Sequence, residues 1–193
     1  MDVSEKQRRL SQQAEQDQAW RFFDLYSLLY NPDWLRAAHA HVKGNAGSKT
    51  AGYDGITMAD FDAQLEKNLA TLAQALKAGT FTPSPVRRSY IQERKADGRT
   101  KVRPLGIPAI ADRIVQEALR MMLEPIFEPD FSRNSYGFRP NRCTQDAVNY
   151  IALRLRGTRA YSWVVEGDIE ACAAPAGLWV HAQWPRPRLQ PVC

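Results

Sequence analysis

Positive charge is concentrated in the segment from Arg87 to Arg103. It holds seven basic and two acidic residues, so it carries 7 minus 2, or +5, which equals the net charge of the whole chain. The basic residues are Arg87, Arg88, Arg94, Lys95, Arg99, Lys101 and Arg103. Side chains alternate between the faces of a strand, so Arg99, Lys101 and Arg103 should share one face and contact consecutive phosphates of a nucleic acid. The alternative is a solvated edge strand that its charges protect from aggregation.

A second group of interest lies in the stretch NSYGFRPNRC. It places Tyr136, Phe138, Arg139 and Arg142 around a glycine. In proteins that bind single-stranded nucleic acids, aromatic rings stack on bases while arginines neutralise the backbone. The alternative is a turn that buries its aromatic rings against the core and leaves its arginines in water. The residue types leave both interpretations open.

Asp168 is the candidate metal ligand. It follows Val164 and Val165, whose β-branched side chains favour a strand. A carboxylate at the end of a strand can bind Mg²⁺ for phosphoryl transfer. One aspartate does not make a metal site, however, because this chemistry needs at least two ligands and often two ions. The position therefore permits metal binding without establishing it.

Helices are expected before the basic segment. Two helical stretches should meet at Asn31–Pro32, because proline cannot continue a helix. Their inward side chains are predicted to be Trp20, Phe23, Leu28, Trp34, Leu35 and Ala38. Thr57 and Asp60 resemble a capping box, and apolar residues then recur at helical spacing until Gly79.

The remaining elements complete the predicted fold class. Two strands should meet at Ala96–Asp97–Gly98, which is a hairpin signal. We expect a helix from Asp112, then a loop and a further helix capped by Thr144, and a last strand from Tyr161 to Ile169. Helices, a hairpin, further helices and a strand in this order indicate an α+β fold rather than an alternating parallel sheet.

The composition is that of an ordinary globular protein. The chain has 193 residues, 44% hydrophobic and 24% charged, which is enough to bury a core. No uncharged run approaches the length of about 18 residues that a membrane span needs, and residues 1–18 are polar without the apolar centre of a signal peptide. A cytoplasmic location without membrane partners is expected, and the sequence pI near 9.2 favours a polyanionic partner.

Cysteines and histidines suggest no chemistry. The three cysteines are widely spaced and odd in number, so neither a disulfide framework nor a Cys-x-x-Cys metal clip is predicted. His39, His41 and His181 are not expected to cluster with carboxylates. We therefore assign none of these residues to a site.

Several ordered motifs together resemble the reverse transcriptases encoded within bacterial group II introns, the intron maturases. They are NAGSKTAGYDGIT, the hairpin ending VRPLGIP, the helix DRIVQEALRMMLEPIFEP, the loop SYGFRPNRC and the strand WVVEGDIEAC. The resemblance extends from about Trp20 to Ile169. It implies the N-terminal helices, the fingers and the first palm strand of a truncated right-hand polymerase.

The resemblance also implies roles for particular residues. Lys95 and Arg103 look like the basic pair that meets the nucleotide triphosphate, and Asp168 looks like the first catalytic aspartate, which holds Mg²⁺. The residues predicted to bind RNA are Arg87, Arg88, Arg99, Lys101, Tyr136, Phe138, Arg139 and Arg142. The expected partners are group II intron RNA or template RNA, with DNA as a further candidate, and dNTP in the complete family member.

The resemblance divides the chain into four parts. We expect a flexible lead at 1–18, a helical extension at 19–80, the reverse transcriptase fingers with the start of the palm at 81–170, and a disordered tail at 171–193. The tail departs from the family pattern at Ala173, so a frameshift near codons 171 to 173 is the hypothesis for its origin. The sequence contains no two adjacent aspartates, and we expect no polymerase activity from this chain alone. The alternatives are a non-catalytic RNA-binding module and a decayed product without function.

Overall fold

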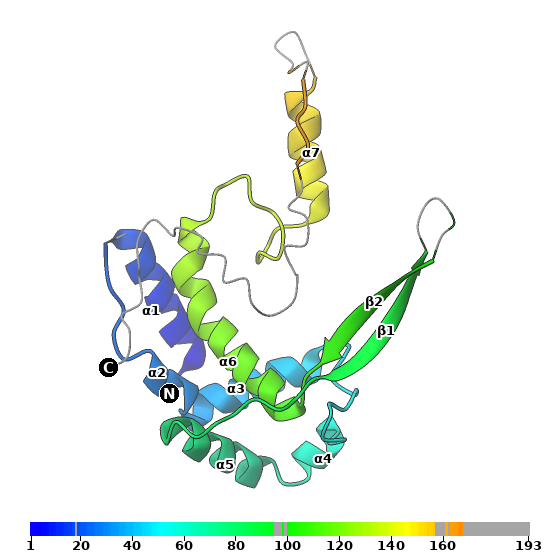
Figure 1. Cartoon of the computed structure of the whole chain (residues 1–193). Helices are drawn as coiled ribbons and strands as arrows, with labels where there is room; N and C mark the ends of the chain where they lie inside the picture. The colour runs from blue at the N-terminus through cyan, green and yellow to red at the C-terminus, as the bar shows by residue number, and fades with distance from the viewer. Residues whose placement is uncertain (18, 95–97, 99, 157–160, 162, 168–193) are drawn as a thin grey trace. The chain divides into compact units, whose positions relative to one another are not determined.

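A computed structural model describes residues 1–17, 19–94, 98, 100–156, 161 and 163–167, with Lys101 described in its backbone only. The described part combines α-helices with one two-stranded antiparallel sheet, as expected for an α+β fold (Figure 1). It divides into two compact units, one formed by Met1–Pro129 and one that begins at Asp130. None of its helices is long and apolar enough to cross a membrane.

The N-terminus differs from the expected flexible lead. Residues Val3–Gln16 form helix α1, which begins with the Asp2 carboxylate accepting a hydrogen bond from the Glu5 backbone N–H at 3.1 Å. Leu10 and Ala14, four residues apart on one face, are buried in the core. The Gln7 side chain also donates to the Met121 carbonyl at 3.0 Å. The sequence of residues 1–18 is mostly polar, and its apolar face consists of only a few residues, so its packing against the core was not predicted.

Helix α2, Tyr26–Leu29, and helix α3, Pro32–Gly44, confirm the predicted break at Asn31–Pro32. The Asn31 side chain caps α3 by accepting hydrogen bonds from the backbone N–H groups of Asp33 and Trp34 at 3.0 and 3.3 Å. Proline stands at the first helical position, where its missing N–H costs no hydrogen bond. Leu28, Trp34, Leu35 and Ala38 point inward as predicted.

Two other inward predictions are wrong. Trp20 and Phe23 are 42% and 65% exposed, whereas Phe22 is buried. The helix begins only at Tyr26, so the helical spacing that placed Trp20 and Phe23 inward does not apply to this segment.

The predicted capping box is confirmed. Thr57 caps α4, Met58–Asp62, and exchanges hydrogen bonds with Asp60 in both directions. The expected single helix is broken at Gln64, and α5 runs from Leu65 to Lys77. The Asn68 side chain donates to the Phe61 carbonyl at 2.9 Å, which satisfies a backbone group near the break.

The predicted hairpin is confirmed as β1, Arg87–Arg94, paired with β2, Thr100–Ile107. The strands are antiparallel, and Arg87 lies opposite Ile107 while Arg94 lies opposite Thr100. Gly98, between the strands, has a φ of +79°, a conformation that glycine adopts without strain. Ala96 and Asp97 lie outside the described residues.

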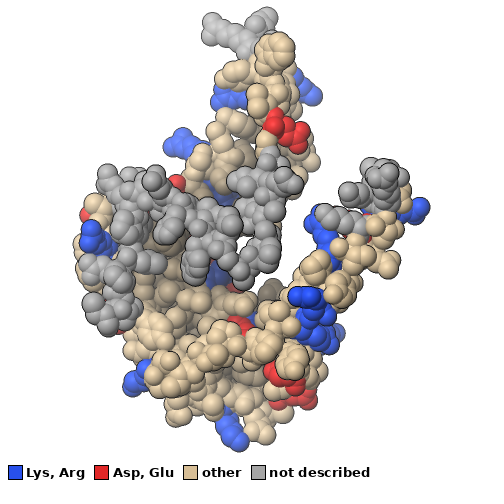
Figure 2. Space-filling model, viewed as in Figure 1, with Lys and Arg blue, Asp and Glu red and all other residues tan. Residues whose placement is uncertain are grey.

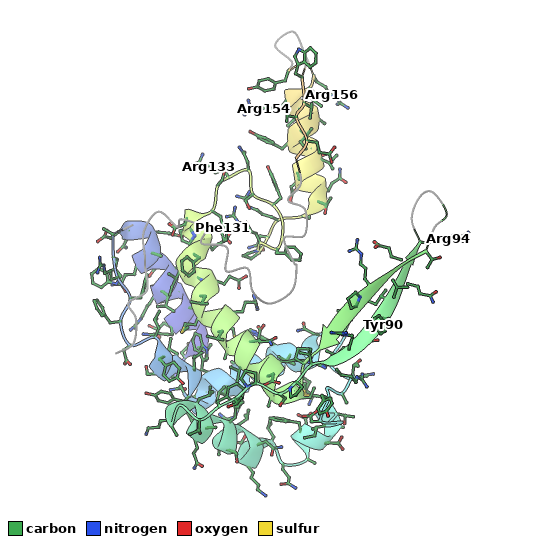
Figure 3. All side chains as sticks on the ribbon, viewed as in Figure 1. Tyr90, Arg94, Phe131, Arg133, Arg154 and Arg156 are labelled. Atoms are coloured by element: carbon green, nitrogen blue, oxygen red, sulfur yellow. The ribbon has the colours of Figure 1, made fainter. Side chains whose placement is uncertain are left out.

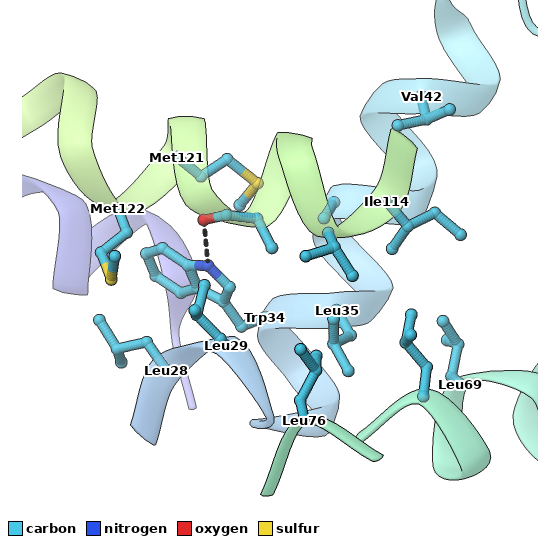
Figure 4. Close-up of a cluster of buried hydrophobic side chains, with 14 of the residues drawn as sticks. Leu28, Leu29, Trp34, Leu35, Val42, Leu69, Leu76, Ile114, Met121 and Met122 are labelled. Atoms are coloured by element: carbon cyan, nitrogen blue, oxygen red, sulfur yellow. Dashed lines mark hydrogen bonds between the residues drawn. The ribbon is translucent and has the colours of Figure 1, made fainter. Parts of the chain in front are cut away.

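Helix α6, Ile110–Phe127, forms the centre of the core. Trp34 is fully buried against it, and the indole N–H donates to the Ala118 carbonyl at 3.0 Å (Figure 4). The buried cluster includes residues of α1, α3, α5 and α6. It therefore extends across the boundary expected between residues 80 and 81, and the two predicted regions share one core.

The second unit contains helix α7, Thr144–Arg154, after the short 3-10 helix Glu128–Asp130 that ends α6. Its cap is Cys143 rather than Thr144: the Cys143 backbone N–H donates to the Asp146 carboxylate at 2.9 Å. The helix thus begins at Thr144 itself. None of its residues is buried.

The strand expected from Tyr161 to Ile169 is not present in residues 161 and 163–167. Trp163 and Val165 are 90% and 96% exposed there. The sheet contains only β1 and β2, so these β-forming residues have no strand to pair with in the described part of the chain. Asp168 and Ile169 lie outside the described residues.

Candidate nucleic-acid interface

The hairpin is a ribbon with solvent on both faces. In β1 only Ser89 is even partly buried. Tyr90, Ile91, Val102 and Leu105 are each at least 45% exposed. Lys and Arg side chains occur along the hairpin in Figure 2. A two-stranded ribbon is marginally stable by itself, and exposed apolar residues interleaved with arginine are typical of a binding surface.

The strand register sorts the ribbon into two faces. Ile91 lies opposite Arg103 and Glu93 lies opposite Lys101. Residues directly opposite each other point to the same face, so Arg103 shares a face with Glu93. We name this the Glu93 face. Arg87 lies on the Glu93 face, because it is an even number of residues from Glu93 along β1, whereas Arg88 lies on the opposite face.

Arg103 is occupied by an ion pair. Its Nε atom lies 2.5 Å from Oε2 of Glu93. The pair is exposed, and exposed ion pairs are weak enough to exchange for a phosphate. Lys95 and Arg99 lie outside the described residues, as does the Lys101 side chain. Of the three basic residues expected to share a face, Arg99, Lys101 and Arg103, only Arg103 has a described side chain.

Two exposed hairpin residues were not among the predicted site residues. Tyr90 and Arg94 lie on the same face as Arg88, because the three residues are spaced by two and by four along one strand. Figure 3 shows Tyr90 on β1 and Arg94 close to the end of that strand. The period of two in the sequence places them on the same face as Arg88, which is one of the predicted RNA-binding residues.

The root of the hairpin is fixed by Arg113 at the start of α6. Its guanidinium donates to the carbonyls of Pro108, Gly47 and Thr50 at 3.0, 3.0 and 2.6 Å. The fork joins the glycine-rich loop after α3 to the end of β2. In the same loop, Gly52 packs against the backbone of Ala109 so closely that a Cβ atom at Gly52 would lie 2.5 Å from the Cα of Ala109.

Asp112 fixes the chain just before β1, at the base of the hairpin. Its carboxylate accepts a hydrogen bond from the Ser84 backbone N–H at 3.0 Å, and the residue is buried. Burial raises the pKa of Asp112, although the backbone hydrogen bonds from Ser84 and Ala109 act against this rise. The hairpin is therefore anchored at both strands while the ribbon itself stays in solvent.

A pocket of about 520 Å³ opens beside this anchor. Arg113, Glu117 and Arg120 line it. Burial acts to raise the pKa of Glu117, but hydrogen bonds from Arg120 and His41 lower it overall. Glu117 pairs with Arg120, and the Arg113 guanidinium is bonded to three backbone carbonyls. The pocket therefore keeps one positive charge, that of Arg113, which already has hydrogen-bond partners.

In the loop of the second unit, the predicted arginines bond the loop itself. The Arg139 guanidinium donates to the carbonyls of Ser132 and Ser135 at 2.7 and 3.0 Å. Arg142 donates to the carbonyls of Arg133 and Ser135 at 2.5 and 3.3 Å. The two side chains thus fix the path of the loop, which neither sequence-based interpretation anticipated.

The loop aromatics differ in exposure. Tyr136 is half-buried, and Cζ of Arg142 lies over its ring, 5.3 Å from the ring centre. The ring centres of Tyr136 and Tyr150 are 6.4 Å apart. Phe138 is fully exposed with a φ of +56°, which is rare for a bulky residue. Phe138 is therefore the more exposed of the two aromatic residues predicted to bind RNA. Further arginines of this unit, Arg133, Arg154 and Arg156, are labelled in Figure 3.

The expectation that histidines avoid carboxylates is wrong. Nε2 of His39 lies 2.7 Å from Oδ1 of Asp62, and Nδ1 of His41 lies 2.9 Å from Oε1 of Glu117. Both pairs join helices that are distant in sequence, a proximity that only the folded chain reveals. Each pair links helices rather than forming an open site.

Among the described residues, no group of three or more His, Cys, Asp or Glu side chains is arranged to hold a metal ion. Asp168 lies outside them. The residues that the structure describes thus do not form a metal centre.

The chain is similar to reverse transcriptases and to intron-encoded proteins. Residues 93–172 match the reverse transcriptase (RNA-dependent DNA polymerase) family. The chain is 41% identical over 173 residues to protein YkfC of Escherichia coli K12, covering 89% of this chain and 44% of that protein. It is 38% identical over 164 residues to the group II intron-encoded protein LtrA of Lactococcus lactis, covering 85% of this chain and 26% of that protein.

A further relative is a 91 kDa protein in the cob intron of Schizosaccharomyces pombe, 38% identical over 144 residues, which are 75% of this chain and 17% of that protein. The resemblance to the reverse transcriptases and maturases of group II introns is thereby confirmed. The chain spans less than half the length of each of these relatives.

Proposed function

We propose that this chain acts as an RNA-binding part of a group II intron-type reverse transcriptase, with its helical extension at 19–80 and its fingers and start of the palm at 81–170. The observation that supports this most is the hairpin: a basic ribbon, anchored at its root and exposed on both faces. A polyanion can contact the arginines of such a ribbon without any rearrangement of the core.

The partner follows from the relatives. LtrA is named as encoded by a group II intron, so the RNA proposed for this chain is a group II intron RNA or a template RNA. The proposed activity of the complete protein is RNA-directed DNA synthesis with assistance to intron splicing. DNA and dNTP are its further proposed ligands.

RNA binding can be tested by fluorescence anisotropy with a labelled single-stranded RNA at several salt concentrations. Each phosphate contact to a single strand contributes about −0.7 to the slope of log K against log salt. With three to four contacts we expect a slope of roughly −2 to −3. An unlabelled competitor RNA is the control for reversible binding. Absence of binding at low salt would refute the proposal.

Within the proposed polymerase, Asp168 would be the first aspartate that holds a divalent ion, and Lys95 with Arg103 would meet the triphosphate. Two-metal phosphoryl transfer also needs further carboxylates, and this sequence has no adjacent pair of aspartates. We therefore expect no primer extension by this chain alone with Mg²⁺ or Mn²⁺. Extension by the purified chain that disappears in an Asp168→Asn variant would overturn this expectation.

The residues after position 172, where the family match ends, are proposed to be translated from a shifted reading frame. The match ends at residue 172, close to the position proposed for a frameshift, and Ala173 departs from the family pattern. Resequencing the coding DNA and translating every frame tests this. A frame that resumes with a Phe-Asp-x-Ile-type run and a later Ala-Asp-Asp strand would support the frameshift, and the absence of such a frame would exclude it.

A further inference from the structure

The face of the hairpin opposite the Glu93 face has a distinct composition. It carries Arg88, Tyr90, Gln92 and Arg94 from β1, paired with Gly106, Pro104, Val102 and Thr100 from β2. We name it the Tyr90 face. It contains two positive charges and no acidic side chain, whereas on the Glu93 face the arginine of β2 is paired with Glu93.

The arginines of the Tyr90 face are available to a ligand. In the described part of the chain, no carboxylate lies within ion-pair distance of Arg88 or Arg94. Both residues are exposed. They are six residues apart on one strand, which corresponds to about 20 Å at 3.3 Å per residue. A polyanion lying along the strand would meet one positive charge near each end of this face.

Tyr90 lies between the two arginines and is 62% exposed. Its cross-strand partner is Pro104, and the partner of Arg88 is Gly106. Neither partner has a long side chain to cover the tyrosine ring. An exposed ring between two arginines that have no carboxylate partner among the described residues suits single-stranded nucleic acid, because the ring can stack on a base while the guanidiniums contact phosphates.

We propose that the Tyr90 face of the hairpin binds a single strand of RNA, with Tyr90 stacked on a base and Arg88 and Arg94 on phosphates to either side. This inference rests on the proposed RNA binding and assigns it to one face. A protein partner would need a carboxylate opposite each arginine, whereas a polynucleotide carries phosphates along its whole length.

The test uses the full chain and a labelled single-stranded RNA of mixed sequence. The Arg88→Ala, Arg94→Ala double variant should bind at least tenfold more weakly at low salt, and its slope of log K against log salt should be smaller in magnitude by about 1.4, or 0.7 for each contact. Tyr90→Leu should weaken binding by roughly fivefold or more, since it removes stacking and keeps apolar surface. Tyr90→Phe keeps the ring and should bind within about twofold of the parent.

A matched control removes two positive charges from the same unit but from helices: Arg9→Ala in α1 with Lys67→Ala in α5. The inference is overturned if this control weakens binding as much as the hairpin double variant, or if Tyr90→Leu and Tyr90→Phe bind alike. In both cases the parent still binds RNA and the proposed function stands. If the parent binds no RNA, the proposed function and this inference fail together. Far-ultraviolet circular dichroism of each variant identifies any loss caused by misfolding.

Discussion

Asp62 shows how one carboxylate joins distant residues. Oδ1 of Asp62 contacts Nε2 of the buried His39 at 2.7 Å, and Oδ2 lies 2.9 Å from Nζ of Lys43. The hydrogen bond from Lys43 lowers the pKa of Asp62, with a smaller contribution from His39. The His39 ring also stacks on Phe61 at 6.0 Å between ring centres. This cluster ties α4 to α3 beside the core.

Replacing Asp62 by Asn should destabilise the protein at neutral pH by about 1 kcal/mol, a typical value for a hydrogen bond to a charged group that is partly exposed. The folded state lowers the pKa of Asp62. The stability contributed by its carboxylate is therefore present above the pKa of Asp62 in the unfolded chain, near 4, and is lost as the pH falls through the pKa of the folded state. Urea denaturation of the parent and the variant at pH 7 and pH 3 measures the difference in stability at each pH. A difference that does not shrink at pH 3 would contradict this assignment.

The control for this prediction is Glu66→Gln, which removes the carboxylate of an exposed ion pair with Arg36 on the surface of the same unit. Exposed pairs contribute little. Its unfolding midpoint should stay close to that of the parent at both pH values.

Side-chain roles in the candidate site could be predicted only in part. The sequence locates the arginines and aromatic rings, and a period of two assigns residues of the hairpin to faces. It does not show that Arg103 pairs with Glu93, because several basic side chains of the hairpin could pair with the same carboxylate. It also does not show that Arg139 and Arg142 bond loop carbonyls, because those contacts depend on the path of an irregular backbone.

At the scale of elements, local signals predicted helix starts better than inward faces. Asn31–Pro32 and the Thr57–Asp60 capping box act within a few residues, so both are confirmed. The break at Gln64 carries no such signal, because a helical apolar spacing continues across it. The unpaired segment after α7 illustrates the limit of strand propensity, since a strand needs a partner that its own residues do not specify.

The loop between α3 and α4 is held to the base of the hairpin by a close backbone approach at Gly52 as well as by Arg113. We predict that Gly52→Ala destabilises the protein by about 1–3 kcal/mol, because the added methyl group would overlap the Ala109 backbone and force it to move. Urea denaturation measures the loss. Limited proteolysis should also show faster cleavage in this loop.

Gly47→Ala is the matched control in the same loop. A Cβ atom at Gly47 would have nothing within 4 Å, and its backbone is not in the left-handed region. We expect nearly unchanged stability. Equal effects of the two substitutions would show that the loop tolerates neither methyl group and that the approach at Gly52 is not special.

At the scale of the whole molecule, apolar burial is uneven between the two units. Every member of the buried hydrophobic cluster lies between Leu10 and Ile126. In the second unit, Val148, Ile151, Leu153 and Leu155 of α7 and its C-terminal flank are all exposed. Arginine contacts with carbonyls and rings hold the loop before α7, and such contacts contribute less to stability than a packed core does.

The distribution of the core predicts that residues 1–129 fold alone. All the described elements whose residues join the buried cluster around α6 belong to this range, so a fragment of residues 1–129 should unfold cooperatively with a midpoint close to that of the full chain. Thermal unfolding followed by circular dichroism compares the two. A fragment of residues 130–167 is the counterpart and should show no cooperative transition, because its described residues bury no side chain fully. A midpoint for the 1–129 fragment more than about 8 °C lower, which corresponds to over 1 kcal/mol in a domain of this size, would show that the second unit stabilises the first.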